Sequence, residues 1–429
     1  MGSPASRLSR RPGSNTPRCG GGGSAPGQDA FLLDDSVMSG RYAGGAPIGD
    51  LRLHPDLDRL VPLAALPGWA LSPADRYAQD GSVHPLDARA LLRRETARLA
   101  AQGWTARAAF EVEWVLSAGR AGEGFVPACS GPAYGMTRIT EQSDYLRDLL
   151  LALEASGVAV EQIHPEYAPG QYELSVAAED PLGAADTAVL VRETIRGVSL
   201  RHGLAASFSP KAEPASLGNG GHVHLSLWRR TSDAPANAMA GGDGPCGMTS
   251  AGESFTAGIL RRLPALLAVG APSVASYLRL VPSHRAGAFS CWGLENREAA
   301  LRFITGADGE QDRAANLEIK CFDPAANPYL ALAALLAAGR AGIDTRDTLP
   351  APVAVEPGAL TPHERDRAGI AALPTTLGES VTAFEADPVL RQALGEAVID
   401  TVCVVRRGEI ELLKDATPEQ VIAATRWRH

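Results

Sequence analysis

The sequence has few cysteines, no long apolar run and no surplus of basic side chains. Its six cysteines are scattered and include no Cys-x-x-Cys pair, which argues against a disulfide framework and a structural zinc site. No stretch approaches the roughly 18 consecutive apolar residues of a membrane span, and the first residues lack the apolar core of a secretory signal. Because 49 acidic residues outnumber 40 basic ones, the formal charge is −9. We therefore expect a soluble, cytoplasmic protein that binds neither membranes nor nucleic acid.

The chain divides into three parts by composition. Residues 1–28 are rich in Gly, Ser, Pro and Arg and predict a disordered tail, because they offer too little apolar surface to offset the entropy of ordering. Residues 29–85 are loop-rich and predict a small N-terminal module. Residues 86–429 alternate strands of period two with longer helical stretches, which predicts an α+β domain with an antiparallel sheet backed by helices. The expected helices are 86–101, 140–156, 181–203, 252–270, 327–343 and 375–398, and the expected strands are 110–116, 158–166, 172–178 and 222–228.

Three of the strand-like segments place charged side chains on one face. Around Phe110 the apolar residues alternate with Glu111 and Glu113, so these two carboxylates share a face. The same alternation groups His222 with His224 and Ser226, and Glu318 with Lys320. For any one segment the simpler interpretation is a solvated polar face, or a structural histidine. The repetition of the pattern favours a functional cluster.

A fourth segment predicts a hairpin, because Pro169 and Gly170 occupy the central positions of a type II turn. Counting outward from this turn places Glu166 directly opposite Glu173. Like charges in that position destabilise a sheet unless a cation neutralises them. Carboxylates with one imidazole suit Mg²⁺ or Mn²⁺ better than zinc or copper.

Arginines follow downstream at positions 279, 285, 297 and 302. Guanidinium groups bind phosphate and carboxylate oxygens in pairs, so a polyanionic substrate beside divalent ions is one interpretation, and surface ion pairs with Glu295 and Glu298 are the other. Carboxylates, a divalent metal and arginines together are typical of phosphoryl transfer. The chain has neither a P-loop nor a Gly-x-Gly-x-x-Gly fingerprint, so we expect any ATP to bind on the sheet.

In sum these segments resemble the glutamine synthetase family, in the family's order from about residue 48 to 394. The motifs are GDLRLHPD, LPGW, DGSVHPLDARALLRR, FEVEW, GPAYGMTR, HPEYAPGQYEL, KAEPASLGNGGHVHLSLW, APSVASYLRLVP, WGLENREAALR and LEIKCFDPAANPYLALAALLAAG. The resemblance implies a partial β-grasp N-terminal domain, a catalytic domain and a dodecamer of two hexameric rings. It also implies an ATP-dependent reaction in which glutamate is phosphorylated and an amine displaces phosphate.

The resemblance also implies roles for individual residues. It implies a first metal ion on Glu113, Glu166 and Glu173, and a second on Glu111, His222 and Glu318. It places His224 and Ser226 at the nucleotide and the catalytic Arg297 and Arg302 at its phosphates. It places the catalytic Arg279 with Lys320 at the glutamate carboxylates, and Gly218 and Gly220 beside the substrate.

Several departures from the family pattern concern ammonia. Members that use ammonia have a glutamate in the flap loop where this chain has Arg285, and an aspartate for which Asp34 or Asp35 is only a distant substitute. The substrate-contacting asparagine is displaced to Asn219, and Lys320 replaces an arginine. The pattern is similar to the branch that joins glutamate to organic amines such as polyamines or ethanolamine, which is the leading hypothesis. The alternatives are glutamine synthetase proper and a non-catalytic oligomeric relative, suggested by the unrecognisable opening β-grasp strands.

Overall fold

The computed structural model describes residues 22–429 except 43, 45–47, 120, 123 and 232–233. Most of the predicted disordered tail, residues 1–21, lies outside the described residues. The last part of that prediction differs from the structure, because Gly22–Ser24 forms strand β1 and Pro26–Ala30 forms a 3-10 helix, η1. Strand β1 pairs antiparallel with Leu51–Pro55. Backbone pairing of this kind does not depend on large apolar side chains, so composition did not reveal it.

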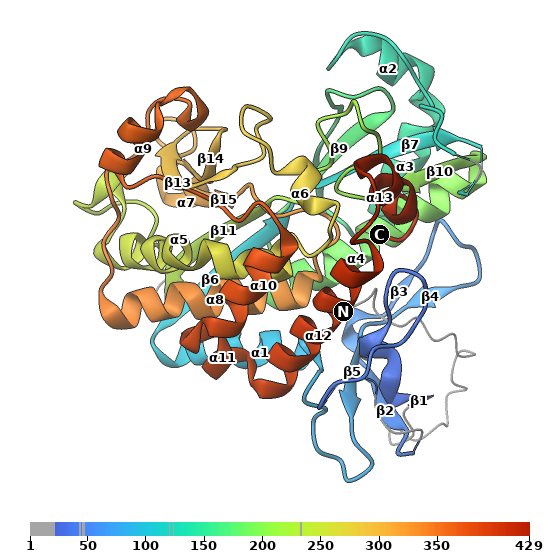
Figure 1. The fold of residues 1–429 in the computed structure, drawn as a ribbon, viewed down its shortest axis with the longest axis horizontal. Helices are drawn as coiled ribbons and strands as arrows, with labels where there is room; N and C mark the ends of the chain where they lie inside the picture. The colour runs from blue at the N-terminus through green and yellow to red at the C-terminus, as the bar shows by residue number, and fades with distance from the viewer. Residues whose placement is uncertain (1–21, 43, 45–47, 120, 123, 232–233) are drawn as a thin grey trace.

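The N-terminal module contains a three-stranded sheet in the order β1-β2-β5 and a separate short hairpin, β3 with β4. The bounds are β2 Leu51–Pro55, η2 Leu57–Arg59, β3 Val61–Pro62, β4 Ala70–Leu71 and β5 Ala74–Tyr77. Figure 1 shows this module, in blue, as a projection from the larger body. Its strands are few and short, in keeping with the partial β-grasp domain that we expected.

A buried arginine of the body forms ion pairs with this module. Arg89, on helix α1 (Ala88–Ala101), is 4% exposed and bonds Asp56 at 2.7 Å and Asp75 at 3.1 Å, both from the module. The same guanidinium bonds Asp186 of helix α4 (Pro181–Arg201) at 2.9 Å. Asp186 also accepts a 2.6 Å hydrogen bond from the Tyr329 hydroxyl. One buried cation thus joins three elements that are distant in the sequence.

The body holds two largely antiparallel sheets. The smaller has the order β10-β7-β9-β8, and the larger has the order β12-β11-β15-β14-β13-β16 with β6 also paired to β11. Only β13 and β14 run parallel among the described strands. The bounds are β6 Trp104–Phe110, β7 Val112–Ala118, β8 Val160–Pro165, β9 Gln171–Val176, β10 Leu204–Ser207, β11 Val223–Arg229, β12 Ala236–Asn237, β13 Phe289–Leu294, β14 Ala299–Ile304, β15 Asn316–Ile319 and β16 Ala371–Ala372.

Most of the longer helices pack on one side of these sheets (Figure 1). Helix α8 (Pro328–Thr345) is buried from residue 328 to 339, as expected for a helix that is apolar on all sides. It starts where Asn327 accepts hydrogen bonds from the backbone of Tyr329 and Leu330, with Pro328 at the first position. The other helices are α2 Met136–Glu141, α3 Ser143–Ala155, α5 Ser250–Gly270, α6 Ser276–Arg279, α7 Gln311–Ala314, α9 Pro362–Ala368, α10 Leu377–Ala386, α11 Pro388–Leu394, α12 Glu396–Leu412 and α13 Pro418–Thr425.

The core is continuous between the larger sheet and these helices. Val223, Leu225 and Leu227 of β11 are fully buried and belong to one apolar cluster with Leu332 and Leu335 of α8. The predicted α+β class, with antiparallel sheets backed by helices, is confirmed. None of the described helices combines the length and apolarity that crossing a lipid bilayer requires.

Candidate active site

Glu111 occupies the point where the chain passes from one sheet to the other. It is the single residue between β6, which pairs with β11, and β7, which pairs with β9 and β10. Its amide donates to the carbonyl of His222 at 3.0 Å, and the amide of Glu113 donates to the carbonyl of Gly220 at 3.2 Å. The expected single strand at 110–116 is therefore two strands. Both carboxylates nevertheless approach His222, Glu111 Oε2 at 3.0 Å from Nδ1 and Glu113 Oε1 at 3.9 Å from Nε2.

Strand pairing brings Glu318 and the two histidines to the same place. On β11 and β15, His224 is the direct partner of Glu318. Glu318 Oε1 lies 3.2 Å from His222 Nδ1, and His224 Nε2 lies 2.9 Å from Glu111 Oε1. Ser226 follows on the same strand, but its hydroxyl accepts a 2.8 Å hydrogen bond from the Trp228 indole. The predicted alternation on β11 therefore places one imidazole on each side of Glu111.

The hairpin after β8 differs from the predicted pairing. The turn is present, with Gln171 N donating to Ala168 O at 3.1 Å and Gly170 at φ +73°. However, Glu166 N donates to Gln171 O, and Glu173 is the partner of His164. The prediction that Glu166 lies opposite Glu173 is therefore wrong by two residues.

A buried arginine explains the longer loop. Arg138 donates to the carbonyls of Glu166, Tyr167 and Ala168 at 2.5, 3.2 and 2.7 Å, so these three carbonyls turn toward one guanidinium instead of a neighbouring strand. The Gln171 side chain meanwhile accepts from Ala168 N at 3.0 Å. Because the slip is by two, Glu166 and Glu173 still share a face.

Two carboxylates do face each other in the structure, but they lie on β7 and β9 and not on the two strands of the hairpin. Glu113 on β7 is the direct partner of Glu173 on β9. His164 lies on the far side of Glu173, with Nε2 3.2 Å from Glu173 Oε1 and Nδ1 3.5 Å from Glu166 Oε1. Sequence reasoning missed His164, although it stands two residues before Glu166 and so shares its face.

Gln171 is a second residue that sequence reasoning missed. Its amide donates to Glu113 Oε2 at 2.9 Å, to Asn219 Oδ1 at 3.0 Å and to the carbonyl of Gly218 at 2.8 Å. Period-two alternation with Glu173 on β9 was the available signal. Asn219 is fully buried and also donates to the carbonyl of Ser209 at 2.9 Å, so it supports the site from behind.

The structure brings all six predicted metal-ligand positions together in overlapping groups. Within each group, one nitrogen or oxygen atom per residue lies within 4.8 Å of the others. The groups are Glu111 with His222 and Glu318, Glu113 with Glu173 and His222, and His164 with Glu166 and Glu173. Oxygen-rich sets with one imidazole match the donor preference of Mg²⁺ or Mn²⁺.

In the metal-free cluster, the pKa values of Glu113 and Glu318 are shifted in opposite directions. Burial, together with the nearby Glu173 and Glu166, raises the pKa of Glu113 to about 8. Around Glu318, burial acts to raise the pKa, but Lys320, His222 and His224 outweigh it and lower the pKa to about 2. Glu113 therefore holds a proton at neutral pH in the absence of a cation, whereas Glu318 is ionised. The excess negative charge that a divalent cation would neutralise is concentrated around Glu113.

Histidines in the cluster are shifted in opposite directions. Burial and the neighbouring Lys320 lower the pKa of His222 to about 4, which leaves its imidazole neutral and able to act as a ligand. The bond to Glu173 outweighs burial and raises the pKa of His164 to about 9. Burial likewise opposes protonation of His224, but bonding to Glu111 raises its pKa to about 9.

Cationic side chains border the carboxylates. Arg279 is 3% exposed and donates to the carbonyls of Phe322 at 3.2 Å and Lys320 at 3.1 Å, with a second contact to His222 Nε2 at 3.2 Å. Lys320 and Arg302 both bond Glu318, at 2.9 and 3.0 Å. The structure does not bring Arg297 into this group, because its side chain is exposed and forms no ion pair within the described residues.

The two predicted glycines lie where a side chain could not fit. A Cβ on Gly220 would come within 2.3 Å of His222 Nε2 and 2.6 Å of Glu113 Oε1. Gly218 has φ +102°, and a Cβ there would meet the carbonyl of Pro210 at 2.4 Å and Arg279 Cγ at 3.0 Å. The backbone of this loop thus passes directly against the carboxylate cluster.

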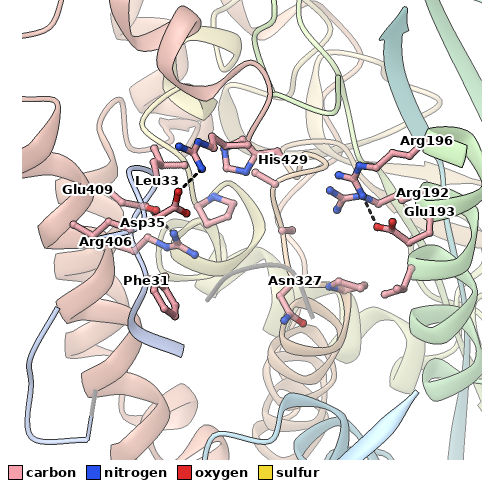
Figure 2. Close-up of a pocket in the computed structure, with 17 residues that line it drawn as sticks. Phe31, Leu33, Asp35, Arg192, Glu193, Arg196, Asn327, Arg406, Glu409 and His429 are labelled. Carbon is pink, nitrogen blue, oxygen red and sulfur yellow. Dashed lines mark hydrogen bonds and ion pairs between the residues drawn. The ribbon is translucent and has the colours of Figure 1, made fainter. Parts of the chain in front are cut away.

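A separate cavity of about 220 Å³ contains none of these residues (Figure 2). Arg406 pairs with Glu409 at 2.7 Å, and Arg428 pairs with Asp35 at 3.0 Å. Asp34, the other distant substitute for an ammonium-binding aspartate, accepts from Ser36 Oγ at 2.5 Å. In this chain neither aspartate reaches the carboxylate cluster.

Comparisons with known proteins agree with this geometry. A family model described as the glutamine synthetase catalytic domain matches residues 85–423. The gamma-glutamylpolyamine synthetase GlnA3 of Streptomyces coelicolor is 54% identical over 411 residues, which cover 95% of this chain and 87% of that protein. Glutamine synthetase of Thermotoga maritima is 34% identical over 383 residues, 87% of this chain and 84% of that protein.

Solved structures show the same likeness. A structure described as a novel glutamine synthase homolog has a TM-score of 0.81 and 33% identity, covering 94% of this chain and 90% of that one. A GmaS/ADP complex has a TM-score of 0.79 and 29% identity, covering 93% of this chain and 88% of that one.

Proposed function

The chain belongs to the glutamine synthetase family, and on that premise we propose that it is an ATP-dependent ligase that joins glutamate to an organic amine, with a polyamine as the leading substrate. The C–N ligase class follows from the family and from the relative at 54% identity. The proposal of a polyamine is supported by the printed function of that relative, gamma-glutamylpolyamine synthetase. It is also supported by the flap position, where Arg285 stands in place of the carboxylate that holds ammonium in family members that use it, a contact that a larger amine does not need.

One observation carries the chemistry: a buried group of carboxylates lies directly beside a group of cations. We propose that Glu111, His222 and Glu318, which form one of the groups, hold one Mg²⁺ or Mn²⁺ ion. We propose that Glu113, Glu166 and Glu173 hold another, since Glu173 belongs both to the group of Glu113 and to the group of Glu166. The donor atoms fit such ions, and the raised pKa of Glu113 marks uncompensated negative charge. When bound, the ions would supply charge neutralisation for the phosphates of ATP.

The remaining predicted residues would then have these roles. His224 and Ser226 would lie at the nucleotide, and Arg297 and Arg302 would bind its phosphates. Arg279 and Lys320 would orient the carboxylates of glutamate, against the backbone at Gly218 and Gly220. The contacts of Ser226 with Trp228 and of Arg302 with Glu318 are ones that bound substrate would compete for.

In the proposed reaction a γ-carboxylate oxygen of glutamate attacks the γ-phosphorus of ATP, and ADP leaves. The amine nitrogen then attacks the γ-carbonyl carbon of the acyl phosphate, phosphate leaves, and the nitrogen loses its extra proton. Placing the two reactants in one site lowers the entropic barrier of both steps. We further propose a cytoplasmic location and a dodecamer of two hexameric rings, both as expected from the family resemblance.

Two alternatives make different predictions. Glutamine synthetase proper would prefer ammonia, which the absence of a carboxylate at position 285 disfavours. A non-catalytic relative would not be expected to retain six ligand positions within one cluster.

The test is phosphate release from Mg²⁺-ATP and glutamate with ammonium, polyamines, ethanolamine and other monoamines, with products identified by mass spectrometry. Release that depends on an organic amine supports the proposal, whereas preference for ammonium or no release with any amine contradicts it. Glu166→Ala should abolish turnover and leave the circular dichroism spectrum unchanged. Turnover equal to that of the unmodified chain would contradict the role of Glu166 as a metal ligand.

A further inference from the structure

Glu298 places a carboxylate next to the flap position that Arg285 occupies. The Glu298 Oε1 atom accepts a 2.7 Å hydrogen bond from the backbone amide of Arg285. Arg285 itself has φ +54° and an exposed side chain. Although residue 285 carries a positive charge, its backbone is thus held by a negatively charged neighbour from another segment.

The register of the larger sheet directs Glu298 toward the site. Arg302 is the partner of Glu318, and Lys320 N donates to Ala300 O, so the even-numbered residues of β14 lie on the cluster face. Glu298 immediately precedes β14 and has the same parity as Arg302.

Unlike Glu318 and Glu295, Glu298 has no cation paired with it among the residues that the structure describes. Glu318 bonds Lys320 and Arg302, and Glu295 also bonds Arg302. Within the described part of the chain, the Glu298 carboxylate forms no ion pair, and its partners are the backbone amides of Arg285 and Ser283. Burial and the nearby Glu356 raise the pKa of Glu298, which makes this carboxylate a better proton acceptor than an exposed glutamate.

The proposed chemistry requires such a group. An alkylamine is protonated at neutral pH, as a lysine side chain is, and cannot attack a carbonyl until it loses a proton. The cluster carboxylates are assigned to cations, and Arg279, Lys320 and Arg302 repel an ammonium group. A carboxylate on the same face, half-buried and free of a cationic partner, meets the requirement.

Resting on the proposed function, we propose that Glu298 is a catalytic residue that binds the ammonium group of the incoming amine and accepts its proton. The N–H bond of the alkylammonium breaks, and the proton passes to a Glu298 carboxylate oxygen. The freed nitrogen lone pair forms the C–N bond as the acyl–phosphate C–O bond breaks, and the second proton that the nitrogen must lose passes to the leaving phosphate. Glu298 then returns its proton to solvent. The carboxylate that handles the amine would thus come from the start of β14 and not from the flap.

The test compares Glu298→Gln with the unmodified chain, using a polyamine and hydroxylamine as nucleophiles. The glutamine keeps an oxygen that can accept from the Arg285 amide, so the flap contact is preserved. Hydroxylamine is largely uncharged at neutral pH and needs neither an anionic binding partner nor prior loss of a proton. We expect kcat/KM for the polyamine to fall about 10²-fold, with KM for ATP unchanged and hydroxamate formation retained.

Glu310→Gln is the matched control. Glu310 is an exposed glutamate whose carboxylate pairs with Arg313 at 3.1 Å, and its replacement should leave both reactions unchanged. Equal losses with both nucleophiles in Glu298→Gln would indicate a structural role and overturn the proposal. Unchanged polyamine coupling, or a selective loss in Glu310→Gln instead, would also overturn it. If the unmodified chain couples no amine at all, the proposed function fails independently of Glu298.

Discussion

Glu113 on β7 and Glu173 on β9 are direct partners across two antiparallel strands, so that two carboxylates face each other in a buried place. Such pairs are unfavourable in a sheet unless a proton or a cation reduces the charge. The raised pKa of Glu113 shows how the metal-free chain accommodates the pair. A bound divalent ion would replace that proton.

Replacing Glu173 should show separately what it contributes to stability and what it contributes to Mg²⁺ binding. We expect Glu173→Gln to change the free energy of unfolding of the metal-free protein by less than about 1 kcal/mol, because relief of the crowding between the facing carboxylates is offset by loss of the ion pair with His164. The same change should reduce the rise in Tm that Mg²⁺ produces. Thermal unfolding in EDTA and in excess Mg²⁺ measures both effects, with the exposed Glu154→Gln as the control. A Mg²⁺-dependent rise in Tm as large as in the unmodified chain would contradict this role of Glu173.

The metal-free protein should lose stability as pH rises from about 7 to 8.5. Glu113, with a pKa of about 8, and His164, with a pKa of about 9, keep protons that the unfolded chain has already released. Each retained proton costs up to about 1.4 kcal/mol per pH unit. Urea unfolding in EDTA across this range measures the slope, which should be smaller in Glu113→Gln. Stability that increases with pH over this range would refute the prediction.

Charge reversal in the flap should change the preference between amines. We expect Arg285→Glu to raise kcat/KM for ammonium relative to a polyamine by about tenfold, because ammonium has no alkyl chain to bind and depends more than a polyamine on a carboxylate at this position. Steady-state rates at varied ammonium and polyamine concentrations give the ratio. Arg285→Gln removes the positive charge without adding a carboxylate and should change the ratio less. An unchanged ratio in Arg285→Glu would exclude the flap as a determinant of amine choice.

The buried Arg89 network should dominate the attachment of the N-terminal module. Asp186→Asn removes the carboxylate that Arg89 and the Tyr329 hydroxyl share, and we expect it to lower the free energy of unfolding by about 3 kcal/mol. Limited proteolysis should then cleave residues 51–77 faster. As a control, Asp144→Asn removes an exposed pair with Arg147 and should cost less than about 1 kcal/mol. Equal effects of the two substitutions would show that the network is not important for attachment.

Alternation along strands identified most of the carboxylates and histidines that meet at the site, although His164 and Gln171 were missed. Glu113, His222 and Glu318 were predicted because each interrupts an apolar pattern of period two. The pairing of the strands was harder to predict, because the hairpin register depends on Arg138, whose contacts with three carbonyls involve a distant segment. Local turn chemistry alone predicted a loop two residues too short.

Breaks within elements were also missed. The segment 375–398 was predicted as one helix, but Asp387 caps a new helix beginning at Pro388, and Gly395 at φ +91° ends it. Likewise the strand around Glu111 divides because its two halves join different sheets. Hydrophobic periodicity continues through such breaks, since both halves bury the same kind of side chain.

The position of Glu111 between the two sheets also bears on how the molecule assembles. The carboxylate cluster around it includes Glu113 from β7 in the smaller sheet and Glu318 from β15 in the larger one, which are far apart along the chain. The cluster therefore cannot exist in a folding intermediate in which only one sheet has formed. A divalent ion would therefore bind only after both sheets of the body have formed, and the bound ion would slow the unfolding of the body.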